Sequence, residues 1–246
     1  LNSGLKVKGI IKGYSGLLNN DIVDMTAASV GNIINRGGTI LYTARCPEFI
    51  DPDPEKAAAA HAKAAENAKL HGIDGLVVIG GDGSWQGAQK LSQHGINVVG
   101  VPGTIDRDIA CTEYTIGFDS AVNIALEAVI RLRDTSASHE RCSVLEVMGR
   151  HCGEIALWAG LCGGADAILI PEQPESANLD YILKVIRENR ARGKNHNIIV
   201  VAEGIGHSQD LAKEIQEITG IESRATILGH VQRGGAPTAL DIKHAS

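Results

Sequence analysis

Short apolar runs alternate with helical segments along the chain, and this alternation constrains the fold more than any other feature. The apolar runs are GLVVIGG, NVVGVPGT, CSVLEV, AILI, NIIVVA and ATILGHV. Helical patterns fall at about residues 54–71, 85–94, 121–133, 154–161, 179–192 and 210–218. Continuous apolar strands separated by helices are typical of βαβ units, in which helices cover both faces of a mostly parallel sheet. The number of strands favours an α/β protein with two Rossmann-like domains over a single domain.

The charge of the chain argues against two classes of partner. Its 246 residues carry 23 basic and 29 acidic side chains, a net charge of −6, and no basic block stands out. We therefore expect neither nucleic acid nor a membrane surface as the main partner. A local cluster of arginines could still bind a small anionic ligand.

The cysteines indicate a reducing compartment. They are odd in number and scattered, and none forms a CxxC pair, which argues against a zinc site or a disulfide framework. Free thiols suit the cytoplasm. No signal peptide is evident, and no apolar run approaches the ~20 residues of a membrane span. We expect a soluble cytoplasmic protein.

The segment GGDGS, residues 80–84, lies between a predicted strand and a predicted helix. Glycines let backbone amides approach a phosphate, and a helix N-terminus favours negative charge. Asp82 could hold Mg²⁺ that bridges phosphate oxygens. Alternatively, the segment is a tight turn in which Asp82 caps the helix. It is not a GxGxxG pattern, and no GKS or GKT follows, so neither a dinucleotide site nor a Walker-type site is indicated.

The segment PGTIDRDI, residues 102–109, places oxygen-bearing side chains on alternate positions: Thr104, Asp106 and Asp108. In an extended segment these three share one side, and Arg107 points to the other. If the strand before them neighbours the strand before GGDGS, the carboxylates gather at one sheet edge. One could then serve Mg²⁺ while another accepts a proton from an attacking hydroxyl. Alternatively, this is an Asp-rich turn whose side chains bond their own backbone.

Several arginines fall near predicted strand ends or glycine turns rather than within helices: Arg45, Arg141, Arg150, Arg224 and Arg233. Guanidinium groups recognise phosphate bidentately. Any one of them could be a solvated surface charge. Together with His230 they favour a site for a phosphorylated ligand at the sheet edge where such folds bind ligands. Glu203, at the end of a buried run, could bond sugar hydroxyls or simply face water.

Several long motifs in one order resemble the bacterial ATP-dependent 6-phosphofructokinases, and the similarity runs nearly from end to end. They are GGDGS, PGTIDRDI with TEYTIGFDSA, SHERCSVLEVMGRHCGE and ILGHVQRGGAPTALD. The resemblance implies two α/β domains: a nucleotide domain from residues 1–117 plus 232–246, and a sugar-phosphate domain from residues 118–231. It also implies a homotetramer that transfers the ATP γ-phosphoryl group to the 1-hydroxyl of fructose 6-phosphate, with Mg²⁺.

The resemblance assigns catalytic roles to three residues. Asp106 would be the general base, Thr104 would stabilise the transferring phosphoryl group, and Arg150 would neutralise charge in the transition state. Asp82 and Asp108 would serve the metal and its water shell, with Asp82 as metal ligand. The implied ATP-binding residues are Arg45, Cys46, Gly81, Asp82, Gly83 and Ser84.

The resemblance also assigns residues to the sugar phosphate and to an effector. The sugar would contact Thr104, Asp106, Asp108, Met148, Gly149, Arg150 and Glu203. The 6-phosphate would contact His230 and Arg233, with Arg141 and Arg224 reaching it from the neighbouring subunit. The implied effector residues are Arg133, Glu172, Lys194 and His196. Another effector position of the family is Ala27 here, and further effector arginines would lie in a segment before residue 1. The resemblance therefore implies only part of an effector site.

The sequence departs from the family in three places. The family's first strand with its GGDxPGxN loop and its final helix-and-strand segment have no counterpart here, so the chain resembles a piece truncated at both ends. Arg107 stands where the family usually has asparagine. Small residues at Gly83 and Gly103 favour ATP over pyrophosphate as donor.

Alternatives to an active 6-phosphofructokinase follow from these departures. One is a catalytically silent fragment that binds sugar phosphate. The others are a pyrophosphate-dependent kinase or an NAD or diacylglycerol kinase, which shares the GGDG turn.

Overall fold

The computed structural model describes residues 4–246, which form two compact units, Leu1–Gly103 and Thr104–Ser246. Each unit has its own core, and parallel strand pairs occur in both, in line with the predicted class. By their contacts, residues 104–117 and 232–246 group with the second unit, whereas the family resemblance assigns them to a nucleotide domain. That functional division stays a prediction.

The first unit begins with an antiparallel pair of strands that the sequence did not predict. Its elements are β1 (Val7–Ile10), α1 (Tyr14–Asn19), β2 (Ile22–Met25), η1 (Ala27–Val30), η2 (Pro47–Ile50), α2 (Pro54–Leu70), β3 (Gly75–Gly80), α3 (Asp82–Gln93) and β4 (Asn97–Thr104). Strands β3 and β4 are parallel, with Gly75 opposite Asn97.

Helix α2 begins and ends as the sequence predicts. The Asp53 carboxylate accepts a hydrogen bond from the Glu55 N–H at 3.0 Å, and Pro54 takes the first helical position. Gly72, just beyond the C-cap His71, has a φ of +63°, a conformation that favours glycine. Local capping chemistry therefore sets the limits of this helix.

Only one face of the β3–β4 pair is covered. Leu76 packs with helices α1, α2 and α3 in the core of the first unit. Val77, Ile79 and Val99, on the alternate positions, are 64–70% exposed. The prediction that helices cover both faces is wrong for this sheet, because these helices of the first unit lie on the same side.

The second unit contains a four-stranded parallel sheet in the order β7-β8-β6-β9. Its elements are β5 (Ile116–Gly117), α4 (Phe118–His139), β6 (Cys142–Val147), α5 (Glu154–Gly163), β7 (Ala167–Leu169), η3 (Pro174–Ala177), α6 (Leu179–Ala191), β8 (Asn197–Ala202), α7 (Ser208–Thr219), β9 (Ser223–Ile227), η4 (Gly229–Arg233) and α8 (Ala239–Ala245).

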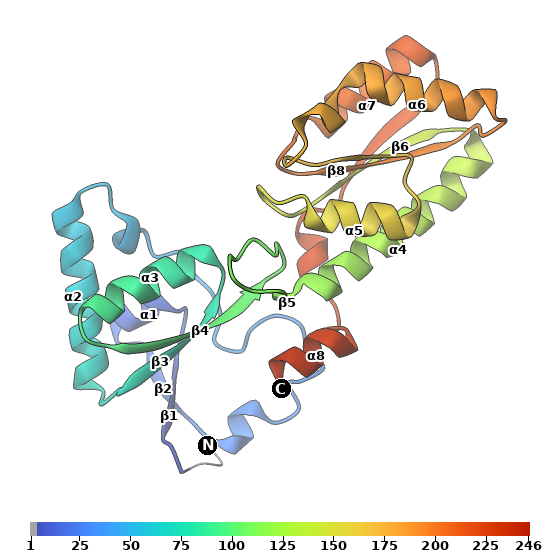
Figure 1. The fold of residues 1–246 in the computed structure, drawn as a ribbon. Helices are drawn as coiled ribbons and strands as arrows, with labels where there is room; N and C mark the ends of the chain where they lie inside the picture. Colours follow the sequence, from blue (N-terminus) through green and yellow to red (C-terminus); the bar gives the residue numbers. More distant parts are fainter. Residues whose placement is uncertain (1–3) are drawn as a thin grey trace. The chain divides into compact units, whose positions relative to one another are not determined.

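Helices cover both faces of this sheet, as predicted (Figure 1). Residues of α4 and α5 pack on one face with Leu145 and Val200. Residues of α6 and α7 pack on the other face with Val144 and Val201. Every residue of β8 is buried, which explains the uninterrupted apolar run NIIVVA. None of the helices in the described part of the chain is long and apolar enough to cross a membrane.

Candidate active site

In the first unit, the GGDGS turn (residues 80–84) joins β3 directly to α3. Gly81 is the N-cap of α3 and makes no side-chain capping bond, so Asp82 lies in the first turn and does not cap the helix. The exposed Asp82 carboxylate instead accepts a hydrogen bond from Gln86 Nε2 at 2.7 Å. The turn therefore presents a carboxylate at the N-terminus of a helix, where the backbone amides also point.

Tyr14 supports this turn from α1. Its hydroxyl donates a hydrogen bond to the carbonyl of Ser84. Burial, with a smaller contribution from Cys46, raises the pKa of Tyr14 to about 12, so the hydroxyl keeps its proton. The sequence offered no signal for this contact, because Tyr14 and Ser84 are 70 residues apart.

The two glycines that favour ATP differ in their surroundings. A Cβ at Gly83 would meet no atom within 4 Å. A Cβ at Gly103 would lie 2.9 Å from Ile79 Cγ2 and 3.4 Å from the Gly80 nitrogen. The packing of β4 against β3 therefore already requires glycine at position 103. Of the two glycines, only Gly83 borders open space that a larger donor could use.

Two further residues assigned to ATP lie in the loop before η2. Arg45 is exposed. The Cys46 thiol donates a hydrogen bond to Glu48 Oε2 at 3.4 Å, and burial is the main cause that raises its pKa to about 11. A protonated, partly buried thiol at Cys46 can line a site but is a poor nucleophile near neutral pH.

In the second unit, the TIDRD loop (residues 104–108) carries the predicted base. β4 ends at Thr104, whose hydroxyl oxygen accepts a hydrogen bond from the Asp106 N–H at 3.2 Å. Burial, then Asp108, then Glu203 raise the pKa of the half-buried Asp106, while Arg233 and Arg150 act in the opposite direction. The structure thus brings four other predicted site residues of this unit close enough to Asp106 to act on its charge: Asp108, Arg150, Glu203 and Arg233.

The carboxyl end of β6 forms a second part of the same site. The Glu203 carboxylate, just after β8, accepts hydrogen bonds from the backbone N–H groups of Arg150 at 2.6 Å and Gly149 at 3.3 Å. Gly149 has a φ of +144°, and a Cβ there would collide with the Cys152 carbonyl. Arg150 has a φ of +59° and is exposed. The tight turn therefore needs glycine at 149 and points Arg150 outward.

Gln232 joins η4 to this turn, and the sequence analysis missed it. Its side chain is 1% exposed and accepts a hydrogen bond from the Met148 N–H at 2.7 Å. It also donates to the Ala121 carbonyl on α4 at 3.5 Å. Its neighbours His230 and Arg233 are exposed, so Gln232 anchors the helix that presents them.

Arg107 points away from the two aspartates beside it. Its Nε donates to the Glu113 carbonyl at 3.2 Å, and its NH1 pairs with Glu154 at 3.0 Å. The predicted direction is therefore confirmed, but the reason behind it is wrong. Residue 107 lies beyond β4 and has a φ of +56°, so strand alternation does not apply.

Arg141 and Arg224 lie elsewhere in the second unit. Both bind the Glu222 carboxylate, Arg141 Nε at 2.7 Å and Arg224 Nε at 2.9 Å. They stand at the starts of the parallel strands β6 and β9, whereas Arg150 and Arg233 follow the ends of the same strands. The expectation that all these arginines share the carboxyl edge is wrong for this pair.

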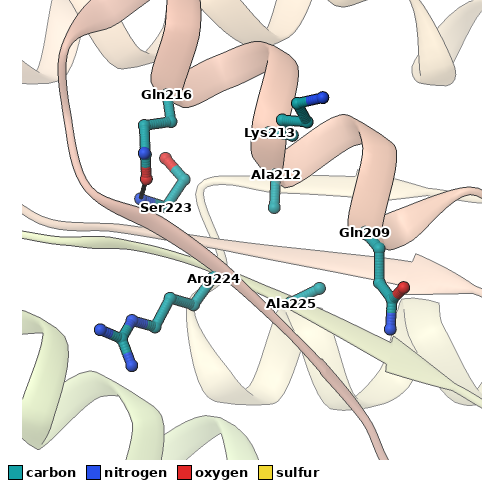
Figure 2. Close-up of a pocket in the computed structure, with 7 residues that line it drawn as sticks. All are labelled: Gln209, Ala212, Lys213, Gln216, Ser223, Arg224 and Ala225. Carbon is teal, nitrogen blue, oxygen red and sulfur yellow. Dashed lines mark hydrogen bonds between the residues drawn. The ribbon is translucent and has the colours of Figure 1, made fainter.

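Arg224 also borders a pocket between α7 and β9, which has a volume of about 390 Å³. Figure 2 shows the residues that line it. Ser223 faces α7, where its N–H donates to Gln216 Oε1 at 3.1 Å, and Arg224 extends away from that helix. This pocket contains none of the residues grouped around Asp106. It lies outside the candidate active site.

Three of the four predicted effector residues gather around Asp166. Lys194 pairs with the Asp166 carboxylate at 2.5 Å, and Arg133 donates to the carbonyls of Gly163 and Gly164. Burial and Lys194 lower the pKa of His196. Glu172 is separate from them. It follows β7, and its carboxylate accepts the Gly153 N–H at 2.8 Å.

The residues that the structure describes do not form a cluster of metal ligands by themselves. Among residues 4–246, no three histidine, cysteine, aspartate or glutamate side chains are close enough together to hold a metal ion. A single carboxylate such as Asp82 still fits Mg²⁺, because that ion commonly takes one or two carboxylates together with substrate phosphates and water.

Comparisons with known proteins agree on one family. The Phosphofructokinase family matches the chain over residues 1–246. The "ATP-dependent 6-phosphofructokinase 1" of Clostridium perfringens is 56% identical over 246 residues, which are 100% of this chain and 75% of that protein.

Solved structures show the same fold. Phosphofructokinase from Saccharomyces cerevisiae superposes with a TM-score of 0.87 at 35% identity, covering 99% of this chain and 36% of that one. A pyrophosphate-dependent phosphofructokinase from Marinobacter aquaeolei has a TM-score of 0.82 at 24% identity, covering 98% and 64%. The second likeness concerns the fold alone.

Proposed function

Because this chain belongs to the phosphofructokinase family, we propose that it transfers the γ-phosphoryl group of ATP to the 1-hydroxyl of fructose 6-phosphate. The products are fructose 1,6-bisphosphate and ADP, in glycolysis. ATP is favoured over pyrophosphate by the name of the 56% identical Clostridium relative and by the open space at Gly83.

The environment of Asp106 is the observation that carries this proposal. A general base works best when its pKa is near the operating pH. Burial and the neighbouring carboxylates of Asp108 and Glu203 raise the pKa of Asp106 in that direction. Asp106 takes the proton of the 1-hydroxyl, whose oxygen then bonds to the γ-phosphorus while the bond to the ADP oxygen breaks.

Cationic and polar groups around Asp106 suit a phosphorylated sugar. The exposed Arg150 neutralises charge as the phosphoryl group moves, and Thr104 stabilises that group. Met148, Gly149 and Glu203 hold the sugar. His230 and Arg233 bind its 6-phosphate, and the Arg233 guanidinium group can do so bidentately. The hydrogen bond from the Met148 N–H to Gln232 holds the turn after β6 next to η4, which supports a joint role for the sugar and phosphate residues on these two segments.

The GGDGS turn suits the phosphates of ATP. Its amides and the N-terminus of α3 favour negative charge, and Gly81, Gly83 and Ser84 leave the backbone accessible. Asp82 is the residue that would hold Mg²⁺, with Asp108 serving its water shell. When bound, Mg²⁺ neutralises the charge that develops on the phosphate oxygens. Arg45 and Cys46 would line the site that holds ATP.

The wider organisation follows from the same proposal. Arg141 and Arg224, at the far end of the sheet, complete the phosphate site of a neighbouring copy in a homotetramer. Arg133, Lys194 and His196, which gather around Asp166, together with Glu172, would form an effector site. The enzyme works in the cytoplasm.

The test is the formation of fructose 1,6-bisphosphate by the purified protein, with ATP or pyrophosphate as donor. We expect product with ATP and a negligible rate with pyrophosphate. The chain spans 75% of its Clostridium relative, so the same assay is run on a version extended to that length. Product from neither protein would contradict the proposal, and product from the extended version alone would mean that this chain is at best a binder of the sugar phosphate.

The role of Asp106 has its own test. Asp106→Ala should lower kcat by about 100- to 10,000-fold, the usual contribution of a general base, while fructose 6-phosphate binding by calorimetry changes little. Glu217→Gln, an exposed carboxylate on α7, is the matched control and should leave both unchanged. An equal loss of binding and turnover in Asp106→Ala would argue against a base.

A further inference from the structure

Arg107 is held by two polar contacts on the side of the TIDRD loop away from the aspartates. Its NH1 lies 3.0 Å from Glu154 Oε2 at the start of α5, and its Nε donates to the Glu113 carbonyl at 3.2 Å. The same Glu154 oxygen accepts a hydrogen bond from Trp158 Nε1 at 3.0 Å. One carboxylate thus fixes both the guanidinium and an aromatic ring.

Three aromatic rings surround the Arg107 guanidinium. Its Cζ lies 5.7 Å from the Tyr114 ring centroid, 5.2 Å from Phe118 and 5.6 Å from Trp158. The rings contact one another edge to face, Tyr114 with Phe118 and Phe118 with Trp158. Cation–π attraction strengthens as a site is desolvated, and the Arg107 side chain is only 26% exposed.

The backbone gives the TIDRD loop little support of its own. The regular strand ends at Thr104, and Arg107 takes a left-handed conformation with a φ of +56°. The Asp106 and Asp108 carboxylates accept no hydrogen bond from the described residues, so their positions depend on the residues beside them. Ile105, which packs against the core of this unit, Arg107 and the buried Ile109 just beyond the loop are side chains through which this segment packs on the unit.

We propose that Arg107 is a positioning residue for the reaction: its contacts with Glu154 and the three rings hold the TIDRD loop so that Asp106 faces the substrate hydroxyl. This inference rests on the proposed base role of Asp106. Arg107 touches neither substrate nor reacting atoms, and acts by keeping the backbone of its neighbour in place. A displacement of about 1 Å in such a group can lower a rate ~10²-fold.

The kinetic test compares Arg107→Met, Arg107→Lys and the wild-type protein. Methionine removes the charge and the fork of donors, and we expect kcat to fall about 10- to 100-fold while KM for both substrates stays within about twofold. Lysine keeps the charge and should restore part of kcat. Arg131→Met, which removes an exposed arginine paired with Glu127 on α4, is the matched control and should leave kcat unchanged.

A double-mutant cycle identifies the partner. Glu154→Gln should lower kcat less than Arg107→Met, and adding it to Arg107→Met should cause little further loss, since both act through one contact. Fully additive losses would show that Arg107 works through something other than Glu154. That outcome would overturn the proposed route.

Hydrogen exchange separates this inference from the proposed function. In Arg107→Met we expect faster amide exchange at residues 104–112 with only a small fall in melting temperature, and neither change in Arg131→Met. Unaltered exchange, or an unaltered kcat, overturns the inference. A third outcome is also informative. If the wild-type protein phosphorylates no sugar, although Arg107→Met exchanges its amides faster than the wild-type protein does, both the proposed function and the catalytic part of the inference are overturned.

Discussion

At the scale of the residue, the proposed base role of Asp106 predicts that the ionisation of this carboxyl group sets the acid limit of activity. Burial, Asp108 and Glu203 all raise its pKa. Since only the ionised form accepts a proton, kcat/KM should rise with pH through a pKa above the ordinary aspartate value of about 4. Asp108→Asn removes one of these causes and should move that acid limb to lower pH.

A pH–rate profile of both proteins measures this shift directly. The test compares the pH at which kcat/KM rises in the two proteins. It does not compare the maximal kcat/KM, because Asp108 is also assigned to the water shell of the metal and its loss can lower that maximum. Glu217→Gln should leave the limb in place. A limb that stays fixed or moves to higher pH in Asp108→Asn would show that a group other than Asp106 limits the rate.

The same raised pKa has a consequence for stability. A carboxyl group whose pKa is higher in the folded protein than in the unfolded chain binds its proton more tightly when folded. Its ionisation therefore destabilises the fold, an effect absent well below the unfolded pKa and fully present above the folded one.

Asp106→Asn should therefore be more stable than the wild-type protein at pH 7, although it is inactive. We expect a gain in the free energy of unfolding, typical where an active site is kept at the expense of stability. The gain should disappear below about pH 4, where wild-type Asp106 is protonated as well. Urea unfolding at both pH values checks this, and a loss of stability at pH 7 would contradict it.

At the scale of the element, helix α4 depends on a carboxylate from α8. Asp241 is 2% exposed and accepts hydrogen bonds from the N–H groups of Gly117 and Ser120, both at 2.8 Å. The Ser120 hydroxyl donates to it as well. The N-terminus of α4 is thus satisfied by a residue more than a hundred positions away, because Gly117, its own N-cap, has no side chain.

Asp241→Ala should lower the free energy of unfolding by roughly 2–4 kcal/mol, since it leaves buried donors unpaired. Asp180→Ala, which removes an exposed acid from the first turn of α6, is the matched control and should change stability by about 0.5 kcal/mol at most. Thermal unfolding of the two variants gives the comparison. Equal effects would mean that Asp241 contributes only its charge near a helix end.

The sequence predicts those helices and strands whose ends are determined by residues close to them in the chain. The caps of α2 and the apolar runs of β6 and β8 lie within a few residues of their own signals. The β1–β2 pair and α8 were not predicted, because their short amphipathic segments carry weak periodicity. The roles of Gln232 and Asp241 were missed for another reason: each bonds a segment more than 80 positions distant, which no local pattern reveals.

At the scale of the whole molecule, the parallel sheet of the second unit separates two groups of arginines. Arg150 and Arg233 follow strand ends, whereas Arg141 and Arg224 stand at strand starts and share the Glu222 carboxylate. Both bonds to Glu222 lower the pKa of that carboxyl group, so it stays ionised and holds the two guanidinium groups side by side. In the proposed homotetramer, this pair of arginines would bind the phosphate held by another copy of the chain.

Mixed assemblies of two inactive variants test that arrangement. Asp106→Ala loses the base, and Arg224→Ser loses a cation that the proposed function assigns to the neighbour's site. If sites are shared, co-assembled variants regain activity, because an intact site forms wherever an Arg224→Ser subunit supplies Asp106 and an Asp106→Ala subunit supplies Arg224. Random association makes about one quarter of the sites intact. Variants assembled separately and mixed without dissociation should stay inactive, and co-assembly without recovery would place the whole site within one chain.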